Sequence, residues 1–242
     1  MICSADLAIA EPPGVRHSVP MQDARTTVLM TGFGPFPGVP VNATMRLVPE
    51  LAQAAVRQFA GARIAVEVLA TEWAAAPRRL DQLHAEIAPD LVLHFGVSAR
   101  ARGLEIEARA RNACMPSPDA AGALPPGAAV RDGGPAVMAA SLPVQHIVTR
   151  LRRLGIPAFV SRDAGRYLCN ATLYHSLGCA RNAPGRRVGF IHIPATLGRP
   201  GGANRGRVGS RTLTWEQAHA GGLEILAACL HLPAAPARTS AP

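Results

Sequence analysis

Short apolar runs separated by helix-like segments constrain this chain more than any other feature of its sequence. One run covers 27–31, a second covers 91–95 and a third covers 188–193, and the first two stop at Gly32 and Gly96. Runs of this length are typical of strands that are buried on both faces, as in parallel sheets covered by helices. The alternation therefore predicts an α/β fold, namely a three-layer α/β/α sandwich around a mostly parallel mixed sheet.

The remaining segments fit this alternation. Apolar spacing predicts helices over 45–59, 74–87, 138–154, 167–177 and 215–230, the last with Thr212 as N-cap, and strands over 63–69 and 158–161. Residues 104–111 alternate strictly between apolar and charged, which predicts a strand that adds an antiparallel pair. Residues 115–135 are rich in Pro and Gly and too long for an ordinary connection, so we expect a functional loop or a subunit contact there.

The length of 242 residues fits one domain with extensions. We expect a loose N-terminal extension over 1–25, a single α/β domain over 26–232 and a frayed tail over 233–242. No stretch approaches the roughly 20 apolar residues of a membrane span, and the first ten residues lack the basic and apolar regions of a signal peptide. The sequence therefore predicts no membrane association.

The charge is +9, and all 25 basic residues are arginine. The arginines are spread along the chain without a long basic run or interleaved aromatic residues, so we do not expect nucleic-acid binding.

The five cysteines are odd in number, widely spaced and without a CxxC pair. This spacing indicates neither a disulfide framework nor a zinc site, and it favours a reducing, cytoplasmic compartment. No cofactor or metal is expected, and one thiol is free to act as a nucleophile.

Ligands of open α/β sheets bind beyond the carboxyl ends of the strands. The segment 32–38 follows the first strand there, but its glycines match neither a dinucleotide loop nor a phosphate-binding loop. Its distinctive residues are Phe33 and Phe36 on a stiff turn. Two interpretations stay open: both rings plug the sheet edge, or both line an apolar slot for a small ligand while only partly buried.

Cys169 follows a tight Ala-Gly turn and lies where a helix is expected to begin, a position that favours the thiolate. A nucleophilic thiol needs a base. His192, near the end of an apolar strand, is the first candidate, and His94, near the end of another strand, competes with it. Either Glu107 or Glu105 is placed to orient the base, and spacing does not choose between them.

Several separated motifs, taken together, resemble the pyroglutamyl peptidase I (pyrrolidone carboxyl peptidase) family of cysteine peptidases. The resemblance covers about 27–230 and rests on Thr31–Phe36 with Val41 and Asn42, on Ile106 and Glu107 leading to Asn112, on Leu142 and Pro143, on Ala164–Asn170 and on Gly189–Pro194. It implies a cytosolic thiol peptidase that removes N-terminal pyroglutamate from peptides without a metal.

Carried over by position, the resemblance assigns Cys169 as nucleophile, His192 as general base and Glu107 as the residue that orients it. It implies further that Phe33 and Phe36 flank the pyrrolidone ring.

The resemblance also implies that Asn42 supports the pocket. The chain departs from the family pattern in the loops 98–103, 117–122 and 198–211. Three alternatives therefore stay open: altered acyl specificity, lost activity, or an anion- or nucleic-acid-binding α/β protein. A homo-oligomer is also left open.

Overall fold

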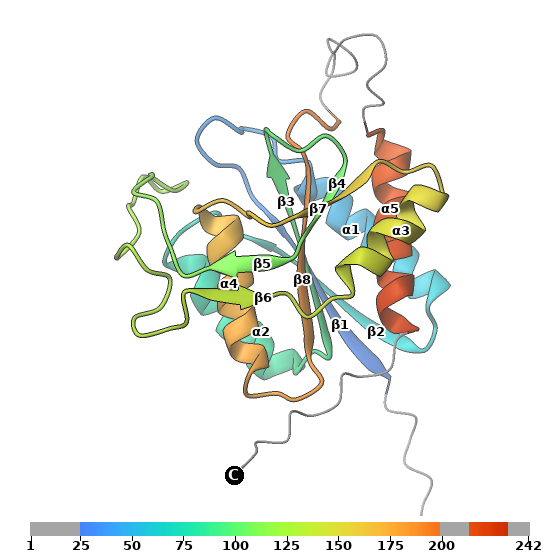
Figure 1. Cartoon of the computed structure of the whole chain (residues 1–242), viewed down its shortest axis with the longest axis horizontal. Helices are drawn as coiled ribbons and strands as arrows, with labels where there is room; N and C mark the ends of the chain where they lie inside the picture. Colours follow the sequence, from blue (N-terminus) through green and yellow to red (C-terminus); the bar gives the residue numbers. More distant parts are fainter. Residues whose placement is uncertain (1–24, 199–212, 232–242) are drawn as a thin grey trace, which may run out of the picture.

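The computed structural model describes residues 25–198 and 213–231, and a six-stranded sheet occupies its centre (Figure 1). Across the sheet the strands are β2 (Ala62–Leu69), β1 (Thr26–Phe33), β3 (Leu91–Ser98), β8 (Arg187–Pro194), β4 (Leu104–Glu107) and β7 (Ala158–Ser161). All neighbours are parallel except β4, which runs antiparallel to β8. The expected mostly parallel mixed sheet is thus confirmed.

Helices cover both faces of this sheet, which gives the three expected layers (Figure 1). One face carries α1 (Thr44–Gln58), α3 (Val144–Arg153) and α5 (Trp215–Leu230), and the other carries α2 (Ala75–Ile87) and α4 (Leu168–Ala180). Among the described residues, no helix is long and apolar enough to cross a membrane.

Alternation along the buried strand β8 decides which residues face the site. Ile191 and Ile193 pack into the core beneath α1, α3 and α5, whereas Phe190 packs into the core beneath α2 and α4. Because side chains of a strand alternate between faces, His192 shares the face of Phe190. The pattern therefore directs His192 towards the layer that contains α4.

The segment expected as one strand over 104–111 divides into two, which corrects that expectation. The main-chain N–H of Ala108 donates to the carbonyl of Ser161 at 2.7 Å, and β4 ends at Glu107. The following residues form β5 (Arg109–Arg111), which pairs antiparallel with β6 (Val137–Ala139) in a separate two-stranded sheet.

Two helix starts also differ from the sequence-based expectation. The helix expected from 138 begins at Val144, because β6 uses the first residues and Pro143 has a fixed φ and no N–H. The last helix is capped by Thr214 rather than Thr212, which lies outside the described residues. The Thr214 hydroxyl accepts from the Gln217 N–H at 3.2 Å, and the Gln217 side chain accepts from the Thr214 N–H at 3.1 Å.

The Pro/Gly-rich passage 115–135 contains no helix or strand but is tied to the domain. The buried carboxylate of Asp119 accepts from the Trp73 N–H at 2.8 Å and from the N–H groups of Ala121 and Ala123, each at 2.9 Å. The residues proposed as the N-terminal extension and the C-terminal tail lie outside the described residues, apart from Arg25.

Candidate active site

The first turn of α4 holds Cys169. A loop over Asp163–Gly165 precedes the helix, and Gly165 adopts a φ of 80°, which favours glycine. The helix N-cap, Tyr167, is extended and gives no side-chain cap. Because the first N–H groups of a helix have no intrahelical acceptor, they are available to an oxyanion beside the thiol.

Close packing places the Cys169 thiol against the sheet. A Cβ atom added to Gly96 on β3 would lie 3.0 Å from the Cys169 Sγ and 2.7 Å from the Phe190 ring. Only glycine at this position leaves room for both groups. The thiol therefore lies directly beside the carboxyl end of the central strands.

His192 and Glu107 form a buried pair across β8 and β4. The His192 Nδ1 lies 2.7 Å from the Glu107 Oε1, and both side chains are almost fully buried. Glu105 is the register partner of His192, yet the carboxylate that reaches the ring belongs to Glu107. The structure thus distinguishes between the two glutamates that spacing left open.

The surroundings of His192 favour its protonated form. Burial lowers the pKa of His192, but the charge and hydrogen bond of Cys169, followed by those of Glu107, outweigh burial and raise that pKa to about 10. A protonated ring beside a thiol is the arrangement expected for a cysteine nucleophile with a paired base.

His94, the competing base, has both ring nitrogens engaged elsewhere. Its Nδ1 lies 2.7 Å from the Thr31 hydroxyl and its Nε2 lies 3.0 Å from the Ser176 hydroxyl. Burial, followed by the charges of His84 and His175, lowers the pKa of His94 to about 3. His94 is therefore a neutral core residue. His84, on α2, is also buried.

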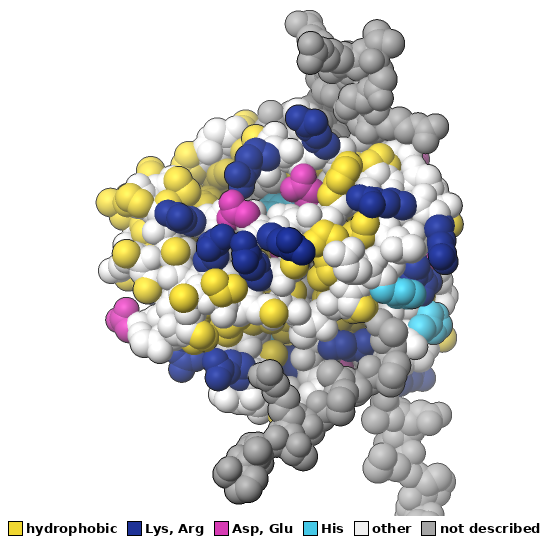
Figure 2. All heavy atoms as spheres, viewed as in Figure 1, with side chains coloured by type: hydrophobic (Ala, Val, Ile, Leu, Met, Phe, Trp, Pro, Cys, Tyr) yellow, Lys and Arg dark blue, Asp and Glu magenta, His cyan; other side chains and the backbone are white. Residues whose placement is uncertain are grey.

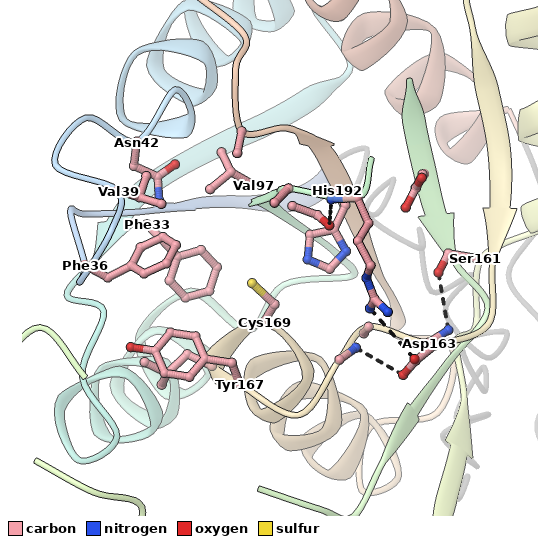
Figure 3. A pocket seen from close by; sticks show the side chains of 18 of the residues that line it. Phe33, Phe36, Val39, Asn42, Val97, Ser161, Asp163, Tyr167, Cys169 and His192 are labelled. Atoms are coloured by element: carbon pink, nitrogen blue, oxygen red, sulfur yellow. Dashed lines mark hydrogen bonds and ion pairs between the residues drawn. The ribbon is translucent and has the colours of Figure 1, made fainter. Parts of the chain in front are cut away.

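A cavity of about 530 Å³ opens in front of Cys169 and His192. In Figure 3, Cys169 lies between the rings of Phe33 and Phe36 on one side and His192 on the other. The Phe36 ring lies 5.7 Å from the Tyr167 ring, measured between centroids. This aromatic side of the cavity suits a small, flat, uncharged group.

The two phenylalanines differ in burial, which corrects the expectation that both are partly exposed. Phe33 is only 2% exposed and its ring lies 6.2 Å from that of Phe190, so it belongs to the core as well as to the cavity wall. Phe36 is half-buried and packs against the core without being one of its buried members. The core interpretation thus holds for Phe33, and the slot interpretation fits Phe36.

Asn42 supports the cavity wall through the main chain. Its amide donates to the carbonyl of Gly34 at 3.1 Å, and its carbonyl oxygen accepts from the Thr44 N–H at 3.1 Å and hydroxyl at 2.8 Å. The Thr71 hydroxyl donates to the same Gly34 carbonyl at 2.9 Å. These bonds hold the loop that carries Phe36.

Sequence reasoning did not single out Tyr167, Thr71 and Trp73 as parts of the site. The Tyr167 ring packs edge-on against Trp73 at 5.2 Å, and its hydroxyl donates to the carbonyl of Pro118 at 3.0 Å. Burial, followed by the charges of Asp119 and Cys169, raises the pKa of Tyr167 to about 12. Aromatic residues make up only 4% of this chain, so each one in a loop is a signal that the sequence itself offers.

Charges of both signs line the mouth of the cavity. Arg100, from the loop that departs from the family pattern, lies 3.8 Å from Asp163, and Glu105 and Arg109 also line the cavity. On the face shown in Figure 2, arginine side chains gather near the middle with acidic side chains beside them. This mixture differs from the uniformly basic surface typical of nucleic-acid binding.

Sequence comparison relates this chain to one family of peptidases. A model of the pyroglutamyl peptidase family matches residues 26–203. The chain is 37% identical to a pyrrolidone-carboxylate peptidase of Clavibacter michiganensis over 180 residues, which cover 74% of this chain and 83% of that protein. It is 34% identical to the pyrrolidone-carboxylate peptidase of Pyrococcus furiosus, over 69% of this chain and 80% of that protein.

Solved structures agree with this match. A variant of the pyrrolidone carboxyl peptidase from Pyrococcus furiosus superposes with a TM-score of 0.74 at 29% identity, covering 84% of this chain and 98% of that one. The pyroglutamyl peptidase I of Bacillus amyloliquefaciens superposes with a TM-score of 0.70 at 30% identity, covering 84% and 95%. In sequence and in fold, the chain belongs to the pyroglutamyl peptidase family.

Proposed function

We propose that this chain is a cysteine peptidase that hydrolyses the bond after an N-terminal pyroglutamyl residue of peptides. One observation carries the proposal: the His192 ring is held by Glu107 at 2.7 Å and lines, together with Cys169, the wall of an aromatic-lined cavity (Figure 3). Membership of the family supports the same substrate class.

The geometry fits two-step acyl transfer. The Cys169 thiolate attacks the pyroglutamyl carbonyl carbon, and N–H groups at the start of α4 stabilise the oxyanion. His192 gives its proton to the leaving amine as the carbon–nitrogen bond breaks. Water, deprotonated by His192, then attacks the thioester and releases pyroglutamate and the thiolate. Glu107 acts as a positioning residue that fixes the ring.

The aromatic wall supports selection of the pyrrolidone ring. The Phe33 and Phe36 rings offer flat apolar surface, while Asn42 fixes the loop between them through Gly34. A cavity of about 530 Å³ exceeds one pyrrolidone ring and leaves room for part of the next residue. Substrate peptides are therefore expected to enter with the N-terminal ring first.

The proposal places the enzyme in the cytoplasm as one α/β domain within residues 26–232. The unpaired thiols of Cys114, Cys169, Cys179 and Cys229 support a reducing compartment. Self-association into a homo-oligomer remains part of the proposal, to be tested by light scattering of the full chain.

Release of a fluorophore from a pyroglutamyl amide, compared with a prolyl amide, tests the function. We expect hydrolysis of the pyroglutamyl amide alone, loss of turnover in Cys169→Ser, and full activity in Cys114→Ser, whose thiol lies outside the cavity. Equal rates on both amides would indicate altered acyl specificity, and no hydrolysis of either by the wild type would contradict the proposal.

A further inference from the structure

A second group of chemically reactive side chains lies on α2 and α4, outside the catalytic cavity. Asp81 comes from α2, and His175 and Cys179 come from α4. One ligand atom from each residue lies within 4.8 Å of the other two. We propose that these three side chains form a binding site for one zinc ion.

The helix geometry pre-arranges two of the three ligands. His175 and Cys179 are four residues apart on α4, so both side chains lie on one face of the helix. The Asp81 Oδ1 lies 2.8 Å from the His175 Nε2 and 4.0 Å from the Cys179 Sγ. Ligand atoms around tetrahedral zinc lie about 3.3–3.8 Å apart, given metal–ligand distances of about 2.0–2.3 Å. Small rotations of these side chains are therefore sufficient to surround the ion.

The donor set selects the metal. One thiolate, one imidazole and one carboxylate suit zinc, whereas calcium and magnesium require oxygen donors. The cluster borders a surface hollow of about 690 Å³, which also contains Asp132 and Tyr174. Solvent reaches the cluster through this hollow, so water is available as the fourth ligand.

The charge balance also permits a divalent ion. Asp81 places a negative charge near Cys179, and Arg186 and Arg131 place positive charges near it. The same arginines oppose an isolated cation. A thiolate and a carboxylate bound to Zn²⁺ form a neutral complex, which removes that repulsion. The ion would replace the contact between Asp81 and His175.

Zinc binding to the full-length Cys169→Ser protein tests the site, because this background removes the active-site thiol. After incubation with zinc and gel filtration, we expect one equivalent of retained metal. Adding His175→Ala together with Cys179→Ser should remove that equivalent. Cys114→Ser and His146→Ala, which change a thiol and an exposed histidine elsewhere, serve as matched controls and should retain it.

Cobalt(II) gives a second readout that needs no enzymatic turnover. We expect a thiolate-to-cobalt charge-transfer band in the Cys169→Ser protein that disappears in Cys169→Ser/Cys179→Ser. Circular dichroism and pyroglutamyl hydrolysis by His175→Ala and Cys179→Ser in the wild-type background check that the fold is intact. Retention of equal metal with and without the His175 and Cys179 changes, or no retention in either, would overturn the site while leaving the peptidase proposal untouched.

Discussion

The Nδ1 atom of His192 lies 2.7 Å from the Oε1 atom of Glu107, 85 positions earlier in the chain. This bond sets the orientation of the ring and leaves Nε2 for the Cys169 side. The second carboxylate oxygen of Glu107 is buried and has no hydrogen-bond partner among the described residues. Desolvation of this oxygen carries an energetic cost, so the carboxylate is better explained by its effect on His192 than by stability.

Replacing Glu107 by Gln should lower kcat/KM about 100-fold or more, because the ring loses the charge that holds its protonated form. The pKa of His192 should fall, and the alkaline limit of activity should move to lower pH. Glu105→Gln is the matched control, since Glu105 shares the strand but does not hold the ring. A reduced rate with an unchanged pH profile in Glu107→Gln would contradict a positioning role.

Removing the thiol should change the titration of His192. Cys169 is the largest cause that raises this pKa, so in Cys169→Ala the pKa of His192 should fall from about 10, as followed by NMR of the imidazole. Because the folded pKa lies above the ordinary value of 6.5, the linked stabilisation is complete below about pH 6.5 and is lost as pH rises towards 10. Denaturant titrations should show that the free energy of unfolding falls less between pH 6.5 and pH 10 in Cys169→Ala than in the wild type. An unchanged His192 pKa in this variant would refute the electrostatic interaction between His192 and Cys169.

Replacing Phe33 should mainly lower stability, whereas replacing Phe36 should mainly lower activity on a pyroglutamyl amide. Phe33→Ala removes a buried ring and should lower the free energy of unfolding by about 3–5 kcal/mol. Phe36→Ala should lower stability less but weaken kcat/KM for a pyroglutamyl amide by about 1–3 kcal/mol. Urea denaturation and kinetics on both variants provide the measurement. Unchanged kinetics in Phe36→Ala would show that the Phe36 ring contributes to packing and not to substrate binding.

His94 should make the fold sensitive to acid. Its pKa is about 3 in the folded protein and returns to about 6.5 on unfolding, so stability is lost as pH falls from about 6.5 towards 3. His94→Gln should unfold at lower urea at pH 7 but lose less stability between pH 7 and pH 4.5. His146→Gln, which alters an exposed histidine, should follow the wild type, and the hypothesis fails if all three proteins lose stability equally.

Local sequence predicts where Cys169 and His192, the proposed nucleophile and base, lie along their elements. Cys169 follows a turn at a helix start and His192 is the polar residue of an apolar strand, and both features are short-range. The choice between Glu105 and Glu107 depends on the register of β4 against β8, which no local pattern contains.

Long-range placement explains the other differences. Phe33 and Phe36 are three residues apart, but Phe33 ends β1 and packs into the core with Phe190, whereas Phe36 lies beyond the strand. Asp81 and His175 meet although 94 positions separate them, so the linear spacing of cysteines and histidines did not indicate a metal site. The break after Glu107 likewise involves a distant partner, because Arg109–Arg111 pair with Val137–Ala139 in a separate sheet.

The position of β8 has a consequence for synthesis of the protein. It is the last strand of the described chain, yet it lies between β3 and β4 in the sheet. A nascent chain that stops before Arg187 has nothing to place between those strands, and it lacks His192, the proposed base. Long-range pairing of this kind makes folding slower. The complete active site therefore forms only after β8 has been synthesised and has inserted between β3 and β4.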